Sequence, residues 1–329
     1  MENTRKSVSD LHVPVLLNTC LDLLAPAFDV PAPLMVDATL GLGGHTEAAL
    51  ERFPNLRVIG IDRDPQALEL AEARLKPFGS RFRPFLGTYD QIDQALGSEQ
   101  ADGILMDLGV SSMQLDESER GFAYSVDAPL DMRMDPSSSF TAADLLNQAS
   151  EDEIARLLWE GADEKFARKI ARNIVAARKK KPLQRTGELT QIVTDSIPAP
   201  ARRSGGHPAK RTFQAVRIAV NDELSILKEA LPTALDSLRV GGRIVVMSYQ
   251  SLEDKIVKKI FAAGSATRGT QLPAGVPVVA AEADQGRRLT QLTRGAVKAA
   301  PEEISANKRA SSVRLRAAEL NREWSSDVS

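Results

Sequence analysis

The stretch Met35-Val-Asp-Ala-Thr-Leu-Gly-Leu-Gly-Gly-His-Thr46 decides the fold. The apolar residues up to Val36 indicate the end of a buried strand, which Asp37 closes, and residues 46–52 have the composition of a helix. Gly41, Gly43 and Gly44 lie between them, and a glycine-rich turn lets a ligand approach the backbone because side chains are missing. The spacing is Gly-x-Gly-Gly rather than the full Gly-x-Gly-x-x-Gly. A tight turn without a ligand therefore explains this motif alone equally well.

A second acid favours a nucleotide. Residues 56–61 form another apolar run, and the run ends at Asp62, 21 residues beyond Gly41. An acid about 20 residues past such a loop is placed to hydrogen-bond a ribose. NAD and S-adenosylmethionine (SAM) both carry this group. We expect Asp62 to bind a ribose, and the alternative is an acid with a purely structural role.

Further apolar runs at 81–86 and 101–107 alternate with segments that have helical character, such as 65–75. Near-continuous apolar strands that alternate with helices predict an α/β fold with a doubly wound parallel sheet, covered on both faces. Ligands of such sheets bind outside the carboxyl ends of the strands. We expect Asp37, Asp62 and Asp107 at that edge, together with His45 and Tyr89.

The alternation is interrupted after residue 123. Residues 124–212 predict helices and loops, and the next strand is expected at 243–249. We therefore expect a first domain of residues 1–123 and 213–329 and an inserted helical domain of residues 124–212. The predicted helices elsewhere span 13–24 and 213–238, and 198–212 is predicted to be a basic loop. Ser251 to Asp254 has the form of a capping box, and 289–293 with 311–316 are the expected final strand pair.

Composition limits the class of protein. The chain has 329 residues, a net charge of −2 and a single cysteine, Cys20, which excludes an internal disulfide and suits a reducing compartment. No secretory signal is visible in residues 1–10, and no apolar run approaches the ~20 residues that span a bilayer. We expect a cytoplasmic protein without a membrane partner. His12, His45 and His207 lack the spacing of metal ligands, so we expect no metal.

The charges are unevenly distributed. Residues 165–217 contain 14 lysines and arginines against only Glu188 and Asp195. A basic block in a nearly neutral chain predicts a polyanionic partner. The alternative is a solvated helix face without a partner.

Several motifs together resemble one family, the bacterial ribosomal RNA small subunit methyltransferase H family, from about His12 to Leu315. The motifs are the Gly41–His45 loop, Gly60–Pro65, Asp107–Ser112, Gln114–Asp116, Glu119–Phe122, Pro129–Asp135, Arg211–Arg217 and Ser251–Asp254. The resemblance implies a class I (Rossmann-like) SAM methyltransferase sheet with an inserted helical domain. It also implies methyl transfer from SAM to the exocyclic N4 of a cytidine in the decoding region of 16S ribosomal RNA, on the assembled small subunit.

The resemblance also implies site residues. The backbone at Gly43, Gly44 and His45 would hold the methionine end of SAM, and Asp62 would hold its ribose. Tyr89 would pack on the adenine, and Asp107 and Gln114 would complete the pocket. This chain departs from the family pattern at three positions: Tyr89 replaces Phe, Met113 replaces Pro, and Gln250 replaces His, which removes an imidazole.

The chemistry requires an acceptor, because the N4 lone pair of cytosine is delocalised and its proton becomes acidic as the new bond forms. Asp107 is the candidate catalytic residue, with the role of orienting the amine. Binding the cofactor alone is an equal alternative for this residue, and the sequence leaves the proton acceptor open. The cytosine should be unpaired or flipped out of a helix to reach the pocket.

The basic block is then expected to contact RNA phosphates, which orient the substrate without reading its sequence. The candidate residues are Arg178, Lys179, Lys180, Lys181, Arg202, Arg203, Lys210 and Arg211. Two other functions compete: a non-catalytic RNA-binding ribosome assembly factor, and a dinucleotide-dependent dehydrogenase. The sequence leaves the oligomeric state open, a homodimer included.

Overall fold

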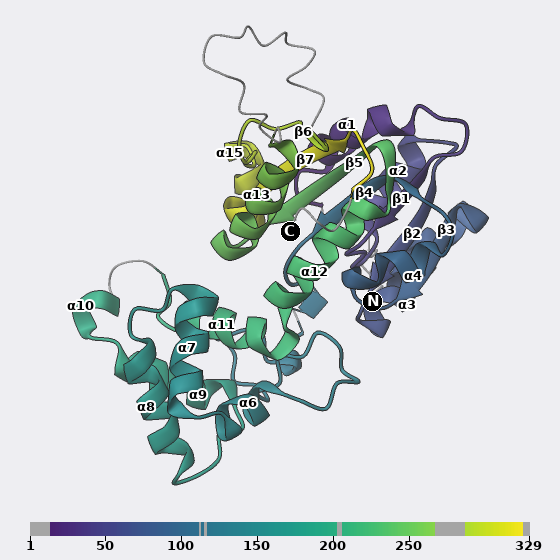
Figure 1. Cartoon of the computed structure of the whole chain (residues 1–329). Coiled ribbons are helices and arrows are strands. Elements are labelled where there is room, and N and C mark those ends of the chain that lie inside the picture. The colour runs from purple at the N-terminus through teal and green to yellow at the C-terminus, as the bar shows by residue number, and fades with distance from the viewer. Residues whose placement is uncertain (1–13, 112, 115–116, 203–205, 267–286, 325–329) are drawn as a thin grey trace, which may run out of the picture. The chain divides into compact units, whose positions relative to one another are not determined.

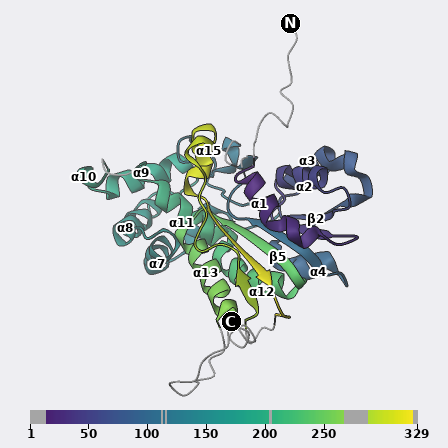
Figure 2. The same cartoon turned by 90° about the horizontal axis from the view of Figure 1, so that it is seen from above.

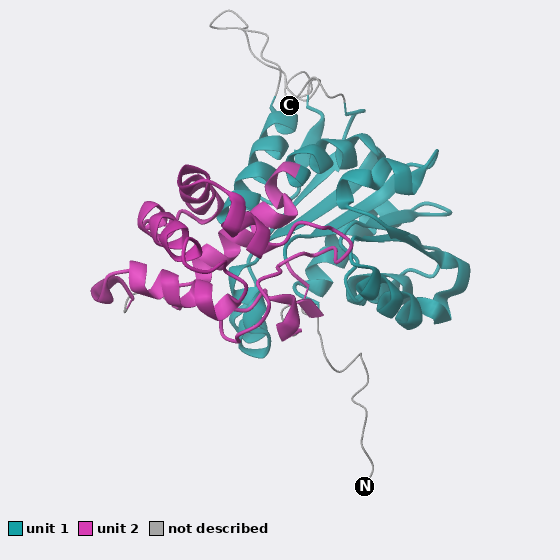
Figure 3. Ribbon diagram, turned by 90° about the horizontal axis from the view of Figure 1, so that it is seen from below, with its two compact units in different colours: residues 1–109, 226–329 teal, residues 110–225 magenta. Residues whose placement is uncertain are grey.

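The chain folds into two compact units, which are distinguished by colour in Figure 3. The computed structural model describes residues 14–111, 113–114, 117–202, 206–266 and 287–324. Unit 1 comprises residues 1–109 and 226–329, and unit 2 comprises residues 110–225. Each unit has its own buried hydrophobic residues. In unit 1 they form a first core on one face of the sheet and a second core on the other face, and unit 2 has a separate core.

Unit 2 is wider than the expected insertion of residues 124–212. Its core includes Phe122 on one side of that range and Val216 on the other. The carboxamide of Asn221 also accepts a hydrogen bond from Met134 N (2.7 Å) and donates one to Met132 O (2.8 Å). Packing and buried polar contacts thus draw residues on both sides of the expected range into unit 2.

Unit 1 is built on a seven-stranded sheet (Figure 1). The strands are β1 (Leu34–Asp37), β2 (Arg57–Asp62), β3 (Phe82–Leu86), β4 (Ala101–Asp107), β5 (Leu238–Ser248), β6 (Leu289–Gln291) and β7 (Arg314–Leu320). Their order in the sheet is β3-β2-β1-β4-β5-β7-β6. The first five are parallel, and β7 is antiparallel to both of its neighbours. The predicted doubly wound sheet and its final strand pair are confirmed.

Helices cover both faces of this sheet (Figure 2). One face packs against α1 (Leu17–Leu24), α2 (Gly44–Arg52) and α3 (Pro65–Leu75), and the other against α4 (Ile92–Leu96), α12 (Glu223–Asp236) and α13 (Ser251–Ser265). In β4, Leu105 belongs to the first core and its neighbours Ile104 and Met106 to the second. Successive side chains point to opposite faces. Burial on both sides explains why residues 103–106 of β4 have no polar side chains.

The shorter elements of unit 1 connect the strands and helices. They are η2 (Ala25–Phe28), η3 (Lys76–Arg81), η4 (Tyr89–Gln91), α15 (Pro301–Ala306) and η6 (Lys308–Ser312). Within the described residues, no helix of either unit is both long and apolar enough to cross a membrane.

The single cysteine is part of the first core. Cys20, on α1, is completely buried, and its thiol donates a weak hydrogen bond to Met247 Sδ at 3.6 Å. Burial and the nearby carboxylates of Asp107 and Asp37 raise the pKa of this thiol well above its usual value. The side chain therefore packs as a small apolar group.

Unit 2 is helical. Its helices are η5 (Ser118–Arg120), α6 (Ala142–Gln148), α7 (Glu151–Ala162), α8 (Ala167–Arg178), α9 (Thr186–Ser196), α10 (Ala199–Arg202) and α11 (Lys210–Asn221). The predicted capping box at α7 is present, since Ser150 and Glu153 bond each other's backbone amides. Gly161 packs so closely on Ala215 that an added Cβ would lie 3.1 Å from its Cα, which brings α7 and α11 together.

Three helix boundaries differ from the sequence prediction. The helix expected at 13–24 begins only at Leu17, because Leu16 has a left-handed backbone (φ 51°). The helix expected at 213–238 is two helices, α11 and α12, which are separated by the left-handed residue Asp222 (φ 50°). The expected loop at 198–212 contains α10 and the first turn of α11.

The start of α13 also differs. The predicted capping box was Ser251 to Asp254, but the observed one joins Gln250 and Glu253. Asp254 instead accepts two hydrogen bonds from Arg316 on β7, at 2.7 and 3.2 Å. A tertiary ion pair thus takes the carboxylate that the local pattern assigned to the cap.

Candidate active site

Three acids lie at the carboxyl edge of the sheet, at the ends of adjacent strands. Asp37 ends β1 and pairs with Gly60 of β2 and Leu105 of β4. Asp62 and Asp107 follow two residues later on those strands, so they flank Asp37 just beyond its end. The expected gathering of these three carboxylates is present within unit 1.

The glycine loop leaves β1 and is shaped by Asp62. Gly41 N donates to Asp62 Oδ2 at 2.7 Å, and Asp64 N donates to Asp62 Oδ1 at 2.9 Å. Gly43 has φ 76°, a conformation that favours glycine, and α2 begins at Gly44, two residues before the expected start. A Cβ on Gly44 would lie 2.7 Å from Pro14 Cγ, so the backbone there is closely covered.

Asp62 keeps capacity for a further donor. A carboxylate offers about four lone-pair sites, and the two backbone amides occupy two of them. Burial raises the pKa of Asp62 to about 6, and the two amide bonds oppose that rise. The group is therefore mostly ionised at neutral pH and able to accept a hydrogen bond from a hydroxyl group.

Asp37 is held from within the same loop. Thr46 Oγ1 donates to its Oδ2 at 2.7 Å, and Thr39 N donates to Oδ1 at 3.3 Å. Burial raises the pKa of Asp37. Its bonds fix the start of α2 against the end of β1, which makes it a support for the loop.

His45 is oriented by the chain before α1. Its Nε2 lies 3.1 Å from the carbonyl of Val15, which can only accept, so Nε2 carries the proton. Burial lowers the pKa of His45, and the ring is therefore neutral. The unprotonated Nδ1 lies 4.0 Å from Asp107 Oδ2.

Asp107 is held at both its backbone and its side chain. Its amide donates to Thr39 Oγ1 at 2.6 Å, and its Oδ1 accepts from the hydroxyl of Tyr249 at 2.8 Å. Burial raises the pKa of Asp107 to about 7 and also raises the pKa of Tyr249. No described residue hydrogen-bonds Oδ2, so this oxygen is the one that a substrate group can use.

Sequence reasoning missed Tyr249 and the threonines that hold the acids. Tyr249 follows β5, the strand next to β4, and so lies at the same edge as Asp107. Its place directly after a buried strand was the available signal. The sequence separation of 142 between the two partners explains why their pairing could not be predicted.

The charge of the edge selects its ligand. Among the residues that the structure describes, none of Asp37, Asp62 and Asp107 has an ion pair with lysine or arginine, and no group of acids, histidines and cysteines could hold a metal ion. Carboxylates that are largely shielded from water and have no such ion pair are stabilised by a nearby cation. The arrangement therefore suits a positively charged organic ligand.

Comparison with known proteins identifies the family. The model of the MraW methylase family matches residues 9–321. The chain belongs to this family. It is similar to proteins named ribosomal RNA small subunit methyltransferase H from Kocuria rhizophila (55% identical, covering 95% of both chains) and from Nocardioides sp. (56% identical, covering 94% of this chain and 96% of the relative).

Solved structures give a weaker match. An rRNA methylase from Streptococcus thermophilus is 15% identical and matches 94% of this chain and 99% of its own, with a TM-score of 0.41. This similarity is too low to carry a conclusion.

Tyr89 begins η4 just after β3, at the expected edge of the sheet, where it is half-buried and packs against the second core of unit 1. The other expected site residues lie in different surroundings. Gln114 is buried in unit 2, where Ser111 N donates to its Oε1 at 3.1 Å. Gln250, at a position where the family resemblance suggested histidine, is buried and donates to Glu253 Oε1 at 3.1 Å. Its observed role is to cap α13.

The expected RNA-binding residues of unit 2 differ in their exposure and in whether they have partners within the protein. Arg178 is half-buried and donates to Leu146 O, and Lys181 pairs with Glu188 at 2.9 Å. Arg211 donates to Asp163 O at 3.1 Å, and Arg203 lies outside the described residues. The remaining candidates are exposed: Lys179, Lys180, Arg202 and Lys210.

Proposed function

We propose that this methylase transfers a methyl group from SAM to the exocyclic N4 of a cytidine in the decoding region of 16S ribosomal RNA, on the assembled small subunit in the cytoplasm. The observation that carries the proposal is the set of three carboxylates, the buried Asp37 and the half-buried Asp62 and Asp107, at one edge of a methylase-family sheet without a lysine or arginine ion-pair partner among the described residues. Such an edge stabilises a sulfonium cation.

In the proposed complex the backbone at Gly43, Gly44 and His45 holds the methionine end of SAM. Asp62 accepts a ribose hydroxyl with its remaining lone pairs, and Tyr89 packs on the adenine. Gln114 is assigned to the pocket by the family resemblance. The loop backbone supports this assignment, because glycine at 43 and 44 lets a ligand lie against it.

Asp107 orients the target amine. Tyr249 holds Oδ1, which leaves Oδ2 for an N4–H of the cytosine. The amine then has to lie about 3–3.5 Å from the methyl carbon and in line with the sulfonium bond. The sulfonium charge lowers the pKa of Asp107, which is about 7 in the free protein, so the carboxylate form prevails in the complex. That form is also the proton acceptor that the forming C–N bond needs.

Unit 2 contributes cations for the RNA backbone. Exposed lysines such as Lys179 and Lys180 neutralise phosphates and position the strand without reading bases. The target cytidine has to leave any base stack before its N4 reaches a site at the edge of a sheet.

A dinucleotide dehydrogenase remains the less favoured alternative. NAD carries a pyrophosphate with two negative charges, and these would face the carboxylates of Asp37, Asp62 and Asp107. Like charges at short range in a partly desolvated site repel strongly. A non-catalytic assembly factor would bind RNA without any need for this carboxylate set.

The test is incubation with methyl-labelled SAM and either unmodified small ribosomal subunits or naked 16S ribosomal RNA. We expect label on N4 of one cytidine of the subunit. The Asp107→Asn variant serves as the matched control, with the same shape and no negative charge. Absence of label in both substrates would overturn the enzyme proposal, and binding of NADH in place of SAM would support the dehydrogenase.

A further inference from the structure

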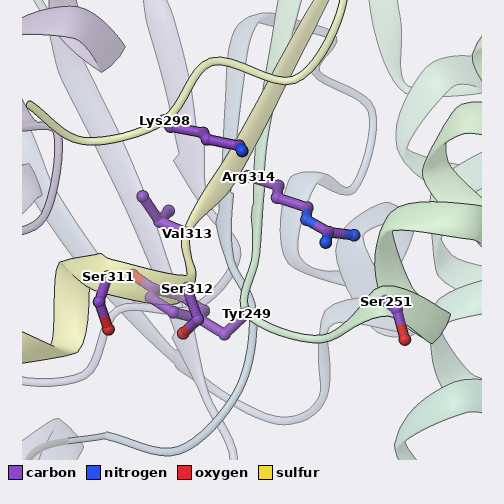
Figure 4. Close-up of a pocket in the computed structure, with 7 residues that line it drawn as sticks. All are labelled: Tyr249, Ser251, Lys298, Ser311, Ser312, Val313 and Arg314. Carbon is purple, nitrogen blue, oxygen red and sulfur yellow. The ribbon is translucent and has the colours of Figure 1, made fainter.

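A surface pocket lies beside the candidate active site in unit 1 (Figure 4). Its volume is about 180 Å³. The lining residues come from the end of β5, the start of α13 and the segment that leads into β7: Tyr249, Ser251, Lys298, Ser311, Ser312, Val313 and Arg314. The pocket shares Tyr249 with the site already described.

The strand register places this pocket at the catalytic edge of the sheet. Ser248, the last residue of β5, pairs with Arg314, the first residue of the antiparallel β7. Asp107 pairs with Met247, which pairs in turn with Leu315. The start of β7 is therefore two strand spacings from Asp107, or about 10 Å. A flipped-out nucleotide and its flanking phosphates can bridge such a separation.

The polar groups of the pocket are almost all donors. Lys298 and Arg314 have no acceptor atoms in their side chains, and three serine hydroxyls can each donate. Within the described residues, neither Lys298 nor any of these hydroxyls has a hydrogen bond or ion pair. Two cations and several hydroxyls that line one pocket suit an anion, because each of these groups can donate a hydrogen bond to it.

The nearby acids leave a positive balance. Asp254 accepts two hydrogen bonds from Arg316 and lies 3.5 Å from Arg314 Nη1. Glu253 accepts hydrogen bonds from the backbone amides of Tyr249 and Gln250 and keeps its negative charge, so two acids, Asp254 and Glu253, stand against three cations, Arg314, Arg316 and Lys298. One carboxylate thus serves two arginines, and Lys298 adds a further charge that nothing in the described structure neutralises.

We propose that this pocket binds a backbone phosphate of the RNA strand next to the target cytidine. Lys298 and Arg314 neutralise the phosphate, and Ser311 and Ser312 donate to its oxygens. This contact orients the flipped-out nucleotide toward Asp107 from the opposite side to the cofactor loop on β1. The inference rests on the proposed function, since it assumes an RNA substrate.

The test compares Lys298→Ala, Arg314→Ala and the double variant with wild type and with Lys76→Ala. Lys76 is an exposed lysine of unit 1 on η3, next to β3 at the far end of the sheet order, so its loss changes the net charge as much as each single variant does. Binding of a fluorescent single-stranded RNA with the decoding-region sequence is measured against salt. The kcat/KM for unmodified small subunits and the Kd for SAM are measured in parallel.

We expect the double variant to lower the salt slope of RNA binding by about 0.7, the contribution of one phosphate to single-strand binding. At 0.15 M salt this amounts to about fourfold weaker RNA binding and a similar loss of kcat/KM. The Kd for SAM should stay unchanged. Lys76→Ala should behave as wild type.

Each other outcome overturns the inference. An unchanged slope in the double variant, or an equal loss in Lys76→Ala, would show that the pocket holds no phosphate. Weaker SAM binding would assign the pocket to the cofactor carboxylate. If the wild-type protein transfers no methyl group to RNA, the proposed function is refuted instead. The difference in the salt slope of RNA binding between wild type and the double variant would still show whether the pocket binds a phosphate.

Discussion

Removal of one hydroxyl, by Tyr249→Phe, tests the role of Asp107. The phenol donates to Asp107 Oδ1 at 2.8 Å and lowers the pKa of that acid, against the larger effect of burial. A hydrogen bond to a charged group contributes roughly 1.5–3 kcal/mol, which corresponds to about 1–2 pKa units. A quarter of the Asp107 side chain is exposed (26%), so water compensates in part, and we expect the lower end of this range.

A rise of about one unit moves the pKa of Asp107 from about 7 to about 8. The ionised fraction at pH 7 then falls from about a half to about a tenth. If the carboxylate is the active form, activity rises with pH through this pKa. The variant should therefore be about fivefold slower at pH 7 and less than about twofold slower at pH 9.

The assay is the pH profile of kcat/KM for SAM, which reports the groups of the free enzyme. Tyr124→Phe is the matched control, because Tyr124 stacks on His207 in unit 2 and its hydroxyl is not part of the site. The reasoning is refuted by a variant whose apparent pKa on the rising limb of the profile equals that of wild type. An equal loss of kcat/KM at every pH would refute it as well, since it would show that the Tyr249 hydroxyl acts without changing the ionisation of Asp107.

Three further predictions concern charge. Asp107→Asn should abolish methyl transfer and raise the free energy of unfolding by about 2 kcal/mol at pH 8, half of the roughly 4 kcal/mol that the pKa difference implies, because the site is partly exposed. Because its pKa is raised, Asp107 keeps a proton in the folded state that it has lost in the unfolded state. The increase in the free energy of unfolding, measured by urea titration, should therefore become smaller toward pH 4. An increase that is the same at every pH would contradict this account. SAM should bind more tightly as pH rises through 6 to 7, because Asp62 and Asp107 ionise there, and calorimetry should show that its binding releases protons. Adenosylhomocysteine has no sulfonium charge, so its affinity should depend less on pH. An equal pH dependence for both ligands would contradict the electrostatic explanation. Lys179→Ala combined with Lys180→Ala should lower the salt slope of RNA binding by about 1.4, for two phosphates, and an unchanged slope would identify a solvated face.

The strands and their terminal acids could be predicted because local pattern and tertiary environment agree there. Residues 103–106 are without polar side chains since β4 is covered on both faces, and Asp107 follows at the point where the cover ends. The spacing of Gly41 and Asp62 predicted that the glycine loop and this acid lie at one nucleotide site, and the two residues are joined by a 2.7 Å hydrogen bond. The assignment of a ribose to Asp62 stays a prediction.

Features fixed by long-range contacts could not be predicted. The helix predicted at 213–238 is interrupted at Asp222, where neither a glycine nor a proline indicates a break. The carboxamide of the adjacent Asn221 forms hydrogen bonds with the backbone of Met132 and Met134. Asp254 does not cap α13 as expected but accepts hydrogen bonds from Arg316, which is 62 residues away in the sequence. The Tyr249 hydroxyl and the pocket beside it depend on the register of β5 and β7, which periodicity does not encode.

The buried thiol of Cys20 makes the natural sequence a convenient background for labelling. It is the single cysteine of the chain, and its burial and raised pKa protect it from alkylating reagents. An engineered surface cysteine would then react alone, without prior removal of native thiols. Two such positions, one in each unit, would accept a pair of spectroscopic dyes and report how the distance between the units changes when cofactor and RNA are added.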